Sequence, residues 1–366
     1  MTASQQKSKG GDRGRELLFD KFSCYILPGR VADPSTGLKE ALDAEAFGLG
    51  AVWISERYAV KEPAVLSGAI SQITSKIDIA GTMFATMRNP IVTASVANTM
   101  QAISNNRFRL LLAKGVPSHL NDMGSPAITF QRLADFIPML RSLWAGETVH
   151  YEGILGRFPE LVLTDRYEGA PPPIIMTAIG EKSLAFAGQH CDGVLIHPFI
   201  TTDGLKKSIN IVHQAAEQAG RDPDSVKIYQ IVIVAPGLQQ DDKEAIVDGR
   251  AVTYFQIPQL GEMICEINGW DKNVLNQVRH HPLFSSLGDK LAEQKFTREQ
   301  LVEVSRVIPQ EWLSAGAAAG SLSCCAEKVC DFLDAGADEI LLHGTTADKL
   351  KPITEKLIDI LPTKYN

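Results

Sequence analysis

The chain has 366 residues, of which 45% are hydrophobic and 22% are charged, and its formal net charge is -7. These proportions are typical of a soluble globular protein with a large core, and α/β barrels of this length commonly form one domain. The acidic balance argues against nucleic acid or an anionic membrane as the main partner. No apolar run reaches the length of a membrane span, so we expect no membrane contact. We also expect the substrate to be a small molecule.

The six cysteines form no C-x-x-C pair and no spacing typical of a zinc site. Scattered cysteines with apolar neighbours favour a reducing cytoplasm. The first 16 residues are polar and lack the apolar core of a signal peptide. We therefore expect a cytoplasmic protein with a disordered tail at residues 1–16 and a single domain at residues 17–366.

Short apolar runs alternate with amphipathic stretches along the whole chain. The predicted strands are, in chain order, residues 22–27, 51–54, 76–82, 108–113, 173–177, 193–196, 226–234 and 339–342. Helices are predicted between them, for example after the capping pairs Asp33-Pro34 and Asn89-Pro90. Residues 148–165 alternate like a β-hairpin inserted before the fifth strand, and about residues 240–318 form a long, mostly helical insertion before the eighth.

The eight predicted strands are nearly all apolar, which indicates a sheet buried on both faces. Helices between successive strands indicate parallel order with right-handed crossovers. An open doubly wound sheet would need a Gly-x-Gly-x-x-Gly turn after its first strand, and the chain has none. The prediction is an α/β fold of the (β/α)8 TIM-barrel type.

Functional residues of such barrels lie at the carboxyl ends of the strands and in the loops that follow. Residues 177–183 (TAIGEKS) lead from a strand into a helix, with Gly180 at the helix start and Lys182 in the first turn. Free N–H groups and the helix dipole make such a place suitable for phosphate. The alternative is an ordinary capped turn between a strand and a helix.

Charged and aromatic groups also follow the second strand. Glu56, Arg57 and Tyr58 leave one strand end together. Arg57 can hold an anionic group by paired hydrogen bonds, and Tyr58 or Glu56 can move a proton. The alternative is an ion pair between Glu56 and Arg57 that only orders the loop.

Three of the eight histidines, His119, His197 and His343, follow strand ends. Converging histidines can bind a metal, but no Asp or Glu shares those strand ends at the spacing of a ligand. We therefore expect no metal site.

At this point the order and spacing of many short motifs resemble a known family. The matching pieces are residues 45–57 (EAFGLGAVWISER), 81–82 (GT), 88–90 (RNP), 106–108 (NRF), 143–147 (LWAGE), 151–153 (YEG), 172–174 (PPI), Ala178, Gly180 and 191–193 (CDG). Together they span about residues 38–197. The chain is similar to the luciferase-like monooxygenase superfamily, and in particular to its actinobacterial branch that uses the deazaflavin coenzyme F420.

The resemblance implies a barrel whose mouth holds a flavin-type ring. It implies a bulge near the third strand end, often with a non-prolyl cis peptide, at Thr82-Met83-Phe84. It places the phosphate contacts at Ala178, Gly180 and Glu181-Lys182. With the strand-end residues, the candidate cofactor contacts are Tyr25, Thr82, Met83, Lys114, Gly115, Ala178, Gly180, Glu181, Lys182 and His197. The candidate catalytic residues are Glu56, Arg57, Tyr58 and His119.

Three departures from the family pattern involve four positions. Arg57 stands where dehydrogenases of the family usually have a histidine. Leu111 and Ala113 stand where the fourth strand usually has glycine, and they narrow the cofactor slot. Val116 replaces the glutamate proton donor of the sugar-phosphate dehydrogenases, which disfavours that activity.

The expected function is therefore an F420-dependent oxidoreductase that transfers a hydride to or from a small organic substrate, with Arg57 as the substrate clamp. A deazaflavin reacts sluggishly with oxygen, which favours hydride transfer over oxygenation. One alternative is an FMN-dependent monooxygenase that receives reduced flavin from a separate reductase and uses O2. Another is a non-catalytic barrel that binds a ligand. By analogy with the family we expect a homodimer, and we expect the 240–318 insertion to cover the mouth.

Overall fold

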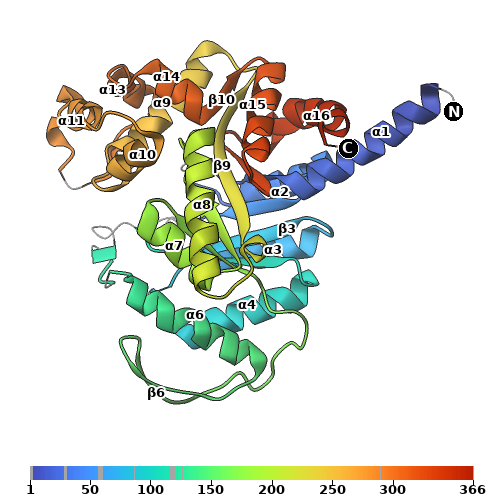
Figure 1. Ribbon diagram of the computed structural model, residues 1–366, viewed down its shortest axis with the longest axis vertical. Coiled ribbons are helices and arrows are strands. Elements are labelled where there is room, and N and C mark those ends of the chain that lie inside the picture. Colours follow the sequence, from blue (N-terminus) through green and yellow to red (C-terminus); the bar gives the residue numbers. More distant parts are fainter. Residues whose placement is uncertain are drawn as a thin grey trace.

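The computed structural model describes residues 3–28, 31–56, 61–85, 87–115, 120–121, 123–125, 127–288 and 290–365. Eight parallel strands form a closed barrel surrounded by helices (Figure 1). The barrel strands are β1 (Phe22–Tyr25), β2 (Ala51–Ile54), β3 (Asp78–Phe84), β4 (Phe108–Ala113), β7 (Ile174–Ala178), β8 (Gly193–Ile196), β9 (Lys227–Pro236) and β11 (Glu339–His343). β9 pairs with β8 on one edge and with β11 on the other, which closes the barrel and confirms the predicted fold.

All eight predicted strands are present, with small shifts at their ends. β1 ends at Tyr25 because Leu27 adopts a left-handed conformation, with a φ of 52°. β3 begins at Asp78 rather than at residue 76, because the N–H groups of Lys76 and Ile77 donate to Glu45 Oε2 over 2.8 and 3.0 Å instead of to a neighbouring strand.

The bulge and the cis peptide that the resemblance implied at Thr82-Met83-Phe84 are absent. β3 continues to Phe84 in unbroken register with β4, since Thr82, Met83 and Phe84 pair with Leu111, Leu112 and Ala113. No peptide bond of the described residues is cis. That expectation was wrong, because the ladder with β4 leaves no extra residue in this part of β3.

The outer helices follow the predicted pattern, except that α2 begins at Thr36 after Ser35 and not at the predicted Asp33-Pro34 cap. They are α2 (Thr36–Phe47), α3 (Pro63–Ile73), α4 (Pro90–Ser104), α6 (Phe130–Ala145), α7 (Glu181–His190), α8 (Thr202–Gln218), α15 (Leu322–Asp334) and α16 (Ala347–Lys364). Asn89 caps α4 by accepting the N–H of Ile91, and Pro90 occupies its first position. Gly48 ends α2 in the left-handed region with a φ of 86°. No helix among the described residues is long and apolar enough to cross a membrane.

Helix α1 (Ala3–Lys21) includes most of residues 1–16, where the sequence predicts a disordered tail. Leu17 and Leu18 are buried, which fixes the end of this helix on the barrel. A Cβ atom at Gly14 would lie 2.1 Å from the carbonyl oxygen of Ile358, so the glycine lets α1 pack directly on the backbone of α16.

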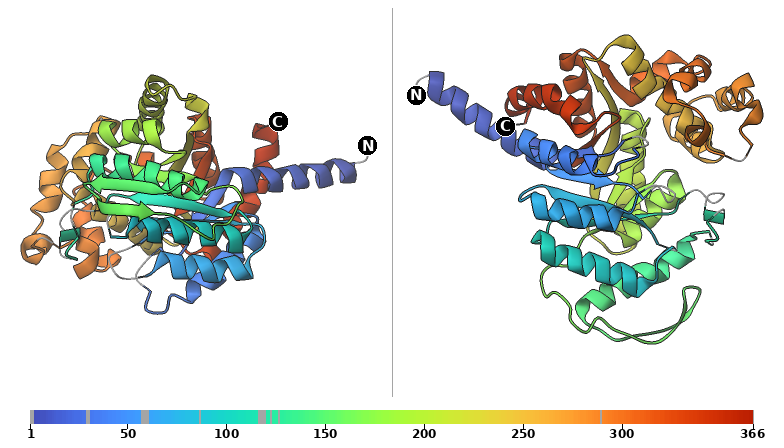
Figure 2. Two further views of the ribbon diagram at one scale, coloured as in Figure 1. Left: turned by 90° about the horizontal axis from the view of Figure 1, so that it is seen from below. Right: turned by 180° about the vertical axis from the view of Figure 1, so that it is seen from behind.

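The predicted hairpin and insertion are both confirmed. The hairpin consists of β5 (Val149–Gly153) and β6 (Gly156–Leu161), and the Tyr151 hydroxyl donates to Asp135 on α6 over 2.7 Å. The insertion contains α9 (Gln240–Phe255), α10 (Leu260–Asn268), α11 (Asn273–Arg279), the short helix η2 (Pro282–Ser286), α12 (Ala292–Lys295), α13 (Arg298–Ser305) and α14 (Gln310–Gly316). Figures 1 and 2 place the insertion and the hairpin at opposite ends of the molecule.

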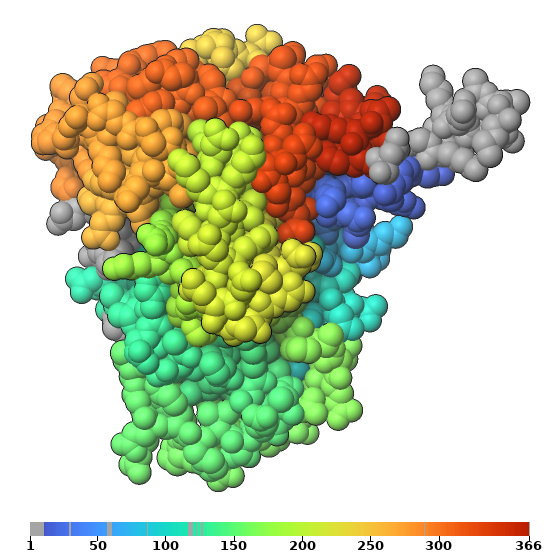
Figure 3. All heavy atoms as spheres, viewed as in Figure 1, coloured from blue at the N-terminus to red at the C-terminus, as the bar shows by residue number. Residues whose placement is uncertain are grey.

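A ninth strand in the main sheet, β10 (Ala317–Gly320), was not predicted. Ile233 of β9 pairs both with His343 of β11 and with Ala317 of β10. β10 therefore lies on the same edge of β9 as β8, but closer to the mouth. It returns the insertion to the barrel, and Figure 3 shows the insertion (orange) and the last two helices (red) as one continuous surface.

The end of the barrel away from the mouth contains a buried cluster of charges. Arg109 of β4 pairs with Asp78 of β3 over 2.8 Å and reaches Glu339 of β11 over 2.7 Å. Its side chain is 16% exposed, that of Glu339 is 7% exposed, and the guanidinium lies 5.6 Å from the ring of Tyr229. The guanidinium thus connects strands that are not neighbours in the sheet.

We predict that Glu339→Ala lowers the free energy of unfolding by about 3 kcal/mol, because it leaves a buried guanidinium short of one partner. Lys206→Ala is the matched control. Lys206 forms an exposed ion pair with Asp203, so its removal should cost less than about 1 kcal/mol. Chemical denaturation measures both, and equal effects would contradict the buried-pair interpretation.

We further predict opposite effects for two glycines of α1. Gly14→Ala should destabilise the fold by about 1–3 kcal/mol, since the new methyl group meets backbone of α16. Gly11→Ala meets no atom within 4 Å and should be neutral or stabilising by up to about 1 kcal/mol. Thermal unfolding compares the two variants, and a stable Gly14→Ala protein would argue against the packing of α1 on α16.

Candidate active site

The carboxyl ends of the barrel strands form one rim, which we call the mouth. Side chains alternate between the inside and the outside of a barrel along each strand. An apolar cluster fills the inside and forms the floor of the mouth; its members are Ala51, Trp53, Ala80, Leu111, Ile175, Leu195, Tyr229, Ile231 and Leu341. By the same alternation the inward positions next to this floor are polar: Tyr25, Thr82, Thr177, His197 and His343.

Two predicted cofactor contacts, Met83 and Ala178, turn their side chains away from the mouth. Both belong to the buried core between the strands and the outer helices. Only their backbone atoms can therefore face a ligand in the barrel. Leu111, in contrast, is inside and 3% exposed, in register with Thr82, so it does occupy part of the floor.

The start of α7 has the features of an anion site. Gly180 precedes the helix with a φ of 78°, a conformation that favours glycine, and no side chain caps the helix. Among the described residues, the backbone N–H groups of Gly180, Glu181 and Lys182 have no hydrogen-bond partner. The hydroxyl of Ser183 is already bonded to Ile179 and Gly180. The helix thus offers free donors at the rim, with the side chains of Glu181 and Lys182 exposed.

Lys114 lies beside this helix. β4 and β7 are neighbours with Leu112 opposite Met176, so Lys114 leaves β4 at the level of Ala178. Its ammonium group lies 3.8 Å from the ring centroid of Phe130, and that ring lies 5.2 Å from Phe186 on α7. Burial lowers the pKa of Lys114. A partly desolvated cation therefore lies over Phe130, at the end of the strand that neighbours β7.

The loop at Gly115 supports this arrangement. Gly115 follows Lys114 and has a φ of 66°, a left-handed conformation that other residues rarely adopt. A Cβ atom there would lie 3.3 Å from Phe84 and 3.4 Å from Leu120. The glycine therefore fixes the turn that directs Lys114 out of β4.

Glu56 is held in place by two hydrogen bonds. Its Oε2 accepts the N–H of Phe84 over 2.6 Å, and its Oε1 pairs with Arg88 Nη2 over 2.8 Å. Arg88 also pairs with Glu62. Both oxygens of Glu56 are occupied, so it ties the end of β2 to the loop after β3. The sequence could not show this pair, because 32 residues separate the partners.

The other candidate catalytic residues, Arg57, Tyr58 and His119, lie outside the described residues, as does Val116. Their roles stay predictions.

His197 is partly buried at the inner side of the mouth. Burial lowers its pKa to about 4, so it is neutral at pH 7. Its Nδ1 has no hydrogen-bond partner in the part of the chain that the structure describes. The ring of Tyr254 on α9 meets it edge-on, with centroids 5.2 Å apart and an interplanar angle of 89°. His197 thus offers a neutral, unpaired polar atom.

The insertion covers part of the mouth, as expected. Arg250 on α9 contacts His343 at the end of β11, over 3.0 Å between Nη1 and Nε2. Met263 on α10 lies over the start of α7, since a Cβ atom at Gly180 would be 2.7 Å from its sulfur. Sequence reasoning missed Arg250, Tyr254 and Met263, because helical periodicity does not show which face of an insertion meets the barrel.

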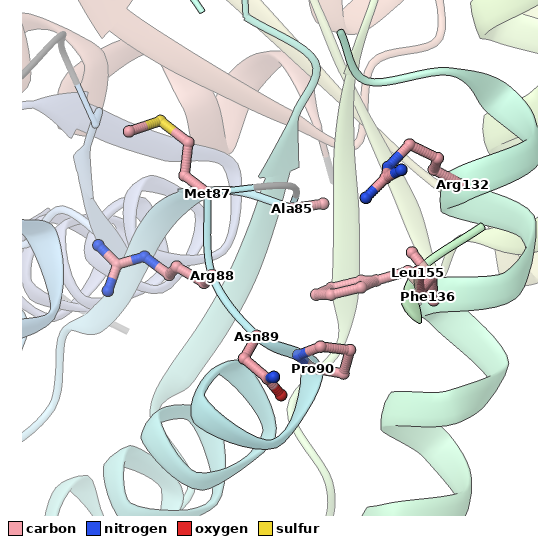
Figure 4. Close-up of a pocket in the computed structure, with 8 residues that line it drawn as sticks. All are labelled: Ala85, Met87, Arg88, Asn89, Pro90, Arg132, Phe136 and Leu155. Carbon is pink, nitrogen blue, oxygen red and sulfur yellow. The ribbon is translucent and has the colours of Figure 1, made fainter. Parts of the chain in front are cut away.

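A pocket of about 230 Å³ opens between the loop after β3, helix α6 and the turn of the hairpin. Figure 4 shows the Arg132 guanidinium and the Phe136 ring extending into it, while Arg88 and Met87 point away. Arg132 Nη1 donates to the carbonyl oxygen of Ile154 over 2.7 Å. Of the predicted cofactor and catalytic residues that the structure describes, none lines this pocket. The described residues contain no cluster of three or more His, Cys, Asp or Glu side chains suited to a metal ion.

Comparisons with known proteins find relatives that match most of the chain. The chain is 24% identical over 323 residues to the 5,10-methylenetetrahydromethanopterin reductase of Methanolobus tindarius, covering 87% of this chain and 91% of that protein. It is 23% identical over 359 residues to the F420-dependent glucose-6-phosphate dehydrogenase of Amycolatopsis mediterranei, covering 92% and 97%.

Solved structures share the fold over almost the whole length. The coenzyme F420 dependent tetrahydromethanopterin reductase of Methanopyrus kandleri matches with a TM-score of 0.75 at 18% identity, covering 93% of this chain and 97% of the other. The oxygenating constituent of 3,6-diketocamphane monooxygenase from Pseudomonas putida, in complex with FMN, matches with a TM-score of 0.65 at 17% identity, covering 94% and 97%. A family model for luciferase-like monooxygenases matches residues 18–339. The chain belongs to the luciferase-like monooxygenase family of oxidoreductases.

Proposed function

We propose that this enzyme is an F420-dependent oxidoreductase that transfers a hydride to or from a small organic substrate at the mouth of the barrel. The observation that carries the proposal is the uncapped start of α7, with Lys114 at the end of the neighbouring strand β4. Free N–H donors at the start of a helix suit a phosphate group, and Lys114 would add a positive charge on the same side of the mouth. The similarity to the reductase of Methanolobus tindarius and to the F420-dependent dehydrogenase of Amycolatopsis mediterranei supports hydride transfer rather than oxygenation.

The described residues fit a flavin-type cofactor at both of its ends. Lys114 and the N–H groups of Gly180 to Lys182 would hold the phosphate. The apolar floor around Trp53 and Leu195 would support a flat ring, and Thr82, Thr177 and His197 would bond to its polar edge. Leu111 is the one bulky group on the floor where the family usually has glycine, so the ring would sit above it.

The chemistry divides between the cofactor and the chain. A bound deazaflavin supplies a carbon atom that gives or accepts a hydride. The chain orients the ring, excludes water with the insertion and supplies neutral hydrogen-bonding groups such as His197. Because both oxygens of Glu56 are engaged, we assign it to ordering the loop after β3. Tyr58 or His119 would transfer the proton of the substrate oxygen. Arg57 would bind the anionic or polar group of the substrate.

The direct test measures the binding of F420 and of FMN to the purified protein. Quenching of tryptophan fluorescence reports the binding. Trp53 lies in the floor of the mouth and reports on a ring bound there. We expect F420 to bind at least about 10-fold more tightly than FMN, a difference of about 1.4 kcal/mol. Tight FMN binding without F420 binding would instead support a flavin monooxygenase. Binding of neither would refute both.

We predict that Lys114→Met weakens F420 binding by about 10-fold to 100-fold, the usual effect of losing a hydrogen bond to a charged group. Lys328→Met is the matched control, because Lys328 lies 5.6 Å from the ring of Phe332 on α15 in a similar contact. Burial lowers the pKa of Lys114, so this lysine loses its positive charge at a lower pH than an ordinary lysine. The F420 affinity of the wild-type protein should therefore fall at that lower alkaline pH. Equal F420 affinities of Lys114→Met and Lys328→Met would show that Lys114 does not contact the cofactor.

A further inference from the structure

The pocket beside α6 combines apolar walls with one charged group. Its lining includes three buried apolar residues, Ala85, Pro90 and Phe136, and the partly buried Leu155 of the hairpin turn. The guanidinium of Arg132 extends from α6 into the same space (Figure 4). An apolar cavity of about 150 Å³ is already large enough for benzene. At about 230 Å³ this pocket has room for a substituted single ring.

Most hydrogen-bond donors of Arg132 have no acceptor. A guanidinium group carries five N–H donors and stays charged in proteins. Arg132 Nη1 donates to the carbonyl oxygen of Ile154 over 2.7 Å. The Nε is buried without a hydrogen-bond partner, and Nη2 bonds to none of the residues that the structure describes. No carboxylate among those residues pairs with Arg132. Because charged groups that are withdrawn from water are normally paired, this guanidinium suits an anion.

Other arginines of the chain receive their acceptors from the chain itself. Arg88, which also belongs to the lining, pairs with Glu56 and Glu62 and points away from the pocket (Figure 4). The guanidinium of Arg107 donates five hydrogen bonds to carbonyl and hydroxyl oxygens. Within the described part of the chain, Arg132 has a single acceptor, and it is the one of the three whose guanidinium extends into a pocket.

Holding the hairpin on α6 does not account for the charge of Arg132. The hairpin is already attached through Tyr151, whose hydroxyl donates to Asp135 over 2.7 Å and accepts the N–H of Leu155 over 3.3 Å. The bond from Arg132 to Ile154 is a second attachment at the same turn, and one N–H donor is enough for it. A neutral donor would serve this purpose equally well.

We propose that this pocket is a second binding site, outside the barrel, for a small molecule in which a carboxylate is attached to an apolar or aromatic group. The carboxylate would accept hydrogen bonds from Arg132, because a planar guanidinium matches its geometry. The apolar part would lie against Phe136, Pro90 and Leu155. The site does not rest on the proposed function, since none of the predicted cofactor contacts that the structure describes lines it.

The first test uses calorimetry to measure binding of benzoate to the wild-type protein. We expect a Kd of about 1 mM or lower, which is reasonable for a ligand of this size. Benzamide has the same ring without the charge and should bind at least about 10-fold more weakly. Inorganic phosphate lacks the apolar part and should also bind at least about 10-fold more weakly. Equal binding of benzamide would refute the role of the charge, and equal binding of phosphate would refute the role of the apolar wall. Absence of benzoate binding would refute the site.

The second test places benzoate in this pocket by substitution. Arg132→Met should weaken benzoate binding at least about 10-fold, the usual effect of losing a hydrogen bond to a charged group. Leu155→Trp fills the pocket from the hairpin and leaves Arg132 in place, so it should cause a similar loss even if Arg132→Met does not fold. Tyr151→Phe is the matched control, because it removes the other attachment of the hairpin; its affinity should stay within about 3-fold of the wild type. Equal losses in Arg132→Met and Tyr151→Phe would reduce Arg132 to an attachment of the hairpin and overturn the proposal.

A third measurement separates this site from the mouth. The F420 affinity of Arg132→Met should stay within about 3-fold of the wild type, as expected for distant sites, and F420 should not displace benzoate. Displacement would show that the pocket belongs to the cofactor site and would overturn its assignment as a second site. A wild-type protein that binds benzoate without F420 would refute only the proposed function, whereas one that binds F420 without benzoate would refute only the second site.

Discussion

The pairing of β9 with both of its neighbours is the constraint on which the remaining structure depends. Its first half bonds to β8 and β11 and closes the barrel. Its second half extends past β8 and pairs with β10, where the insertion returns. This strand of ten residues thus closes the barrel, and it also fixes the two ends of the helical insertion. Without that extension, α9 would have no defined position over the mouth.

The mouth that results has positive groups on two sides. On the side of β4 and β7 lie Lys114 and the positive end of α7. On the side of β11 and β1, the guanidinium groups of Arg250 and Arg298 both donate to the carbonyl oxygen of Pro28. His197, at the end of β8 between these sides, is neutral at pH 7. An anionic molecule would therefore meet positive groups at more than one part of the rim.

Local signals in the sequence were enough to predict the barrel and its strand ends. Apolar runs, the Asn89-Pro90 cap and the glycine before α7 depend on neighbouring residues, so they can be recognised without the fold. Contacts between distant residues could not be predicted. Glu56 binds Arg88, which is 32 residues away, and 93 residues separate Arg250 from His343. β10 has the sequence Ala-Ala-Ala-Gly, which shows little preference for a strand, and Gly14 looks flexible until α16 lies against it.

The position of Met263 has a steric consequence. Its sulfur stands so close to Gly180 that α10 lies directly above the donors at the start of α7. Under the proposed function, Met263 would stand beside the phosphate group bound at these donors. The size of its side chain would then set how much room the phosphate group has above Gly180.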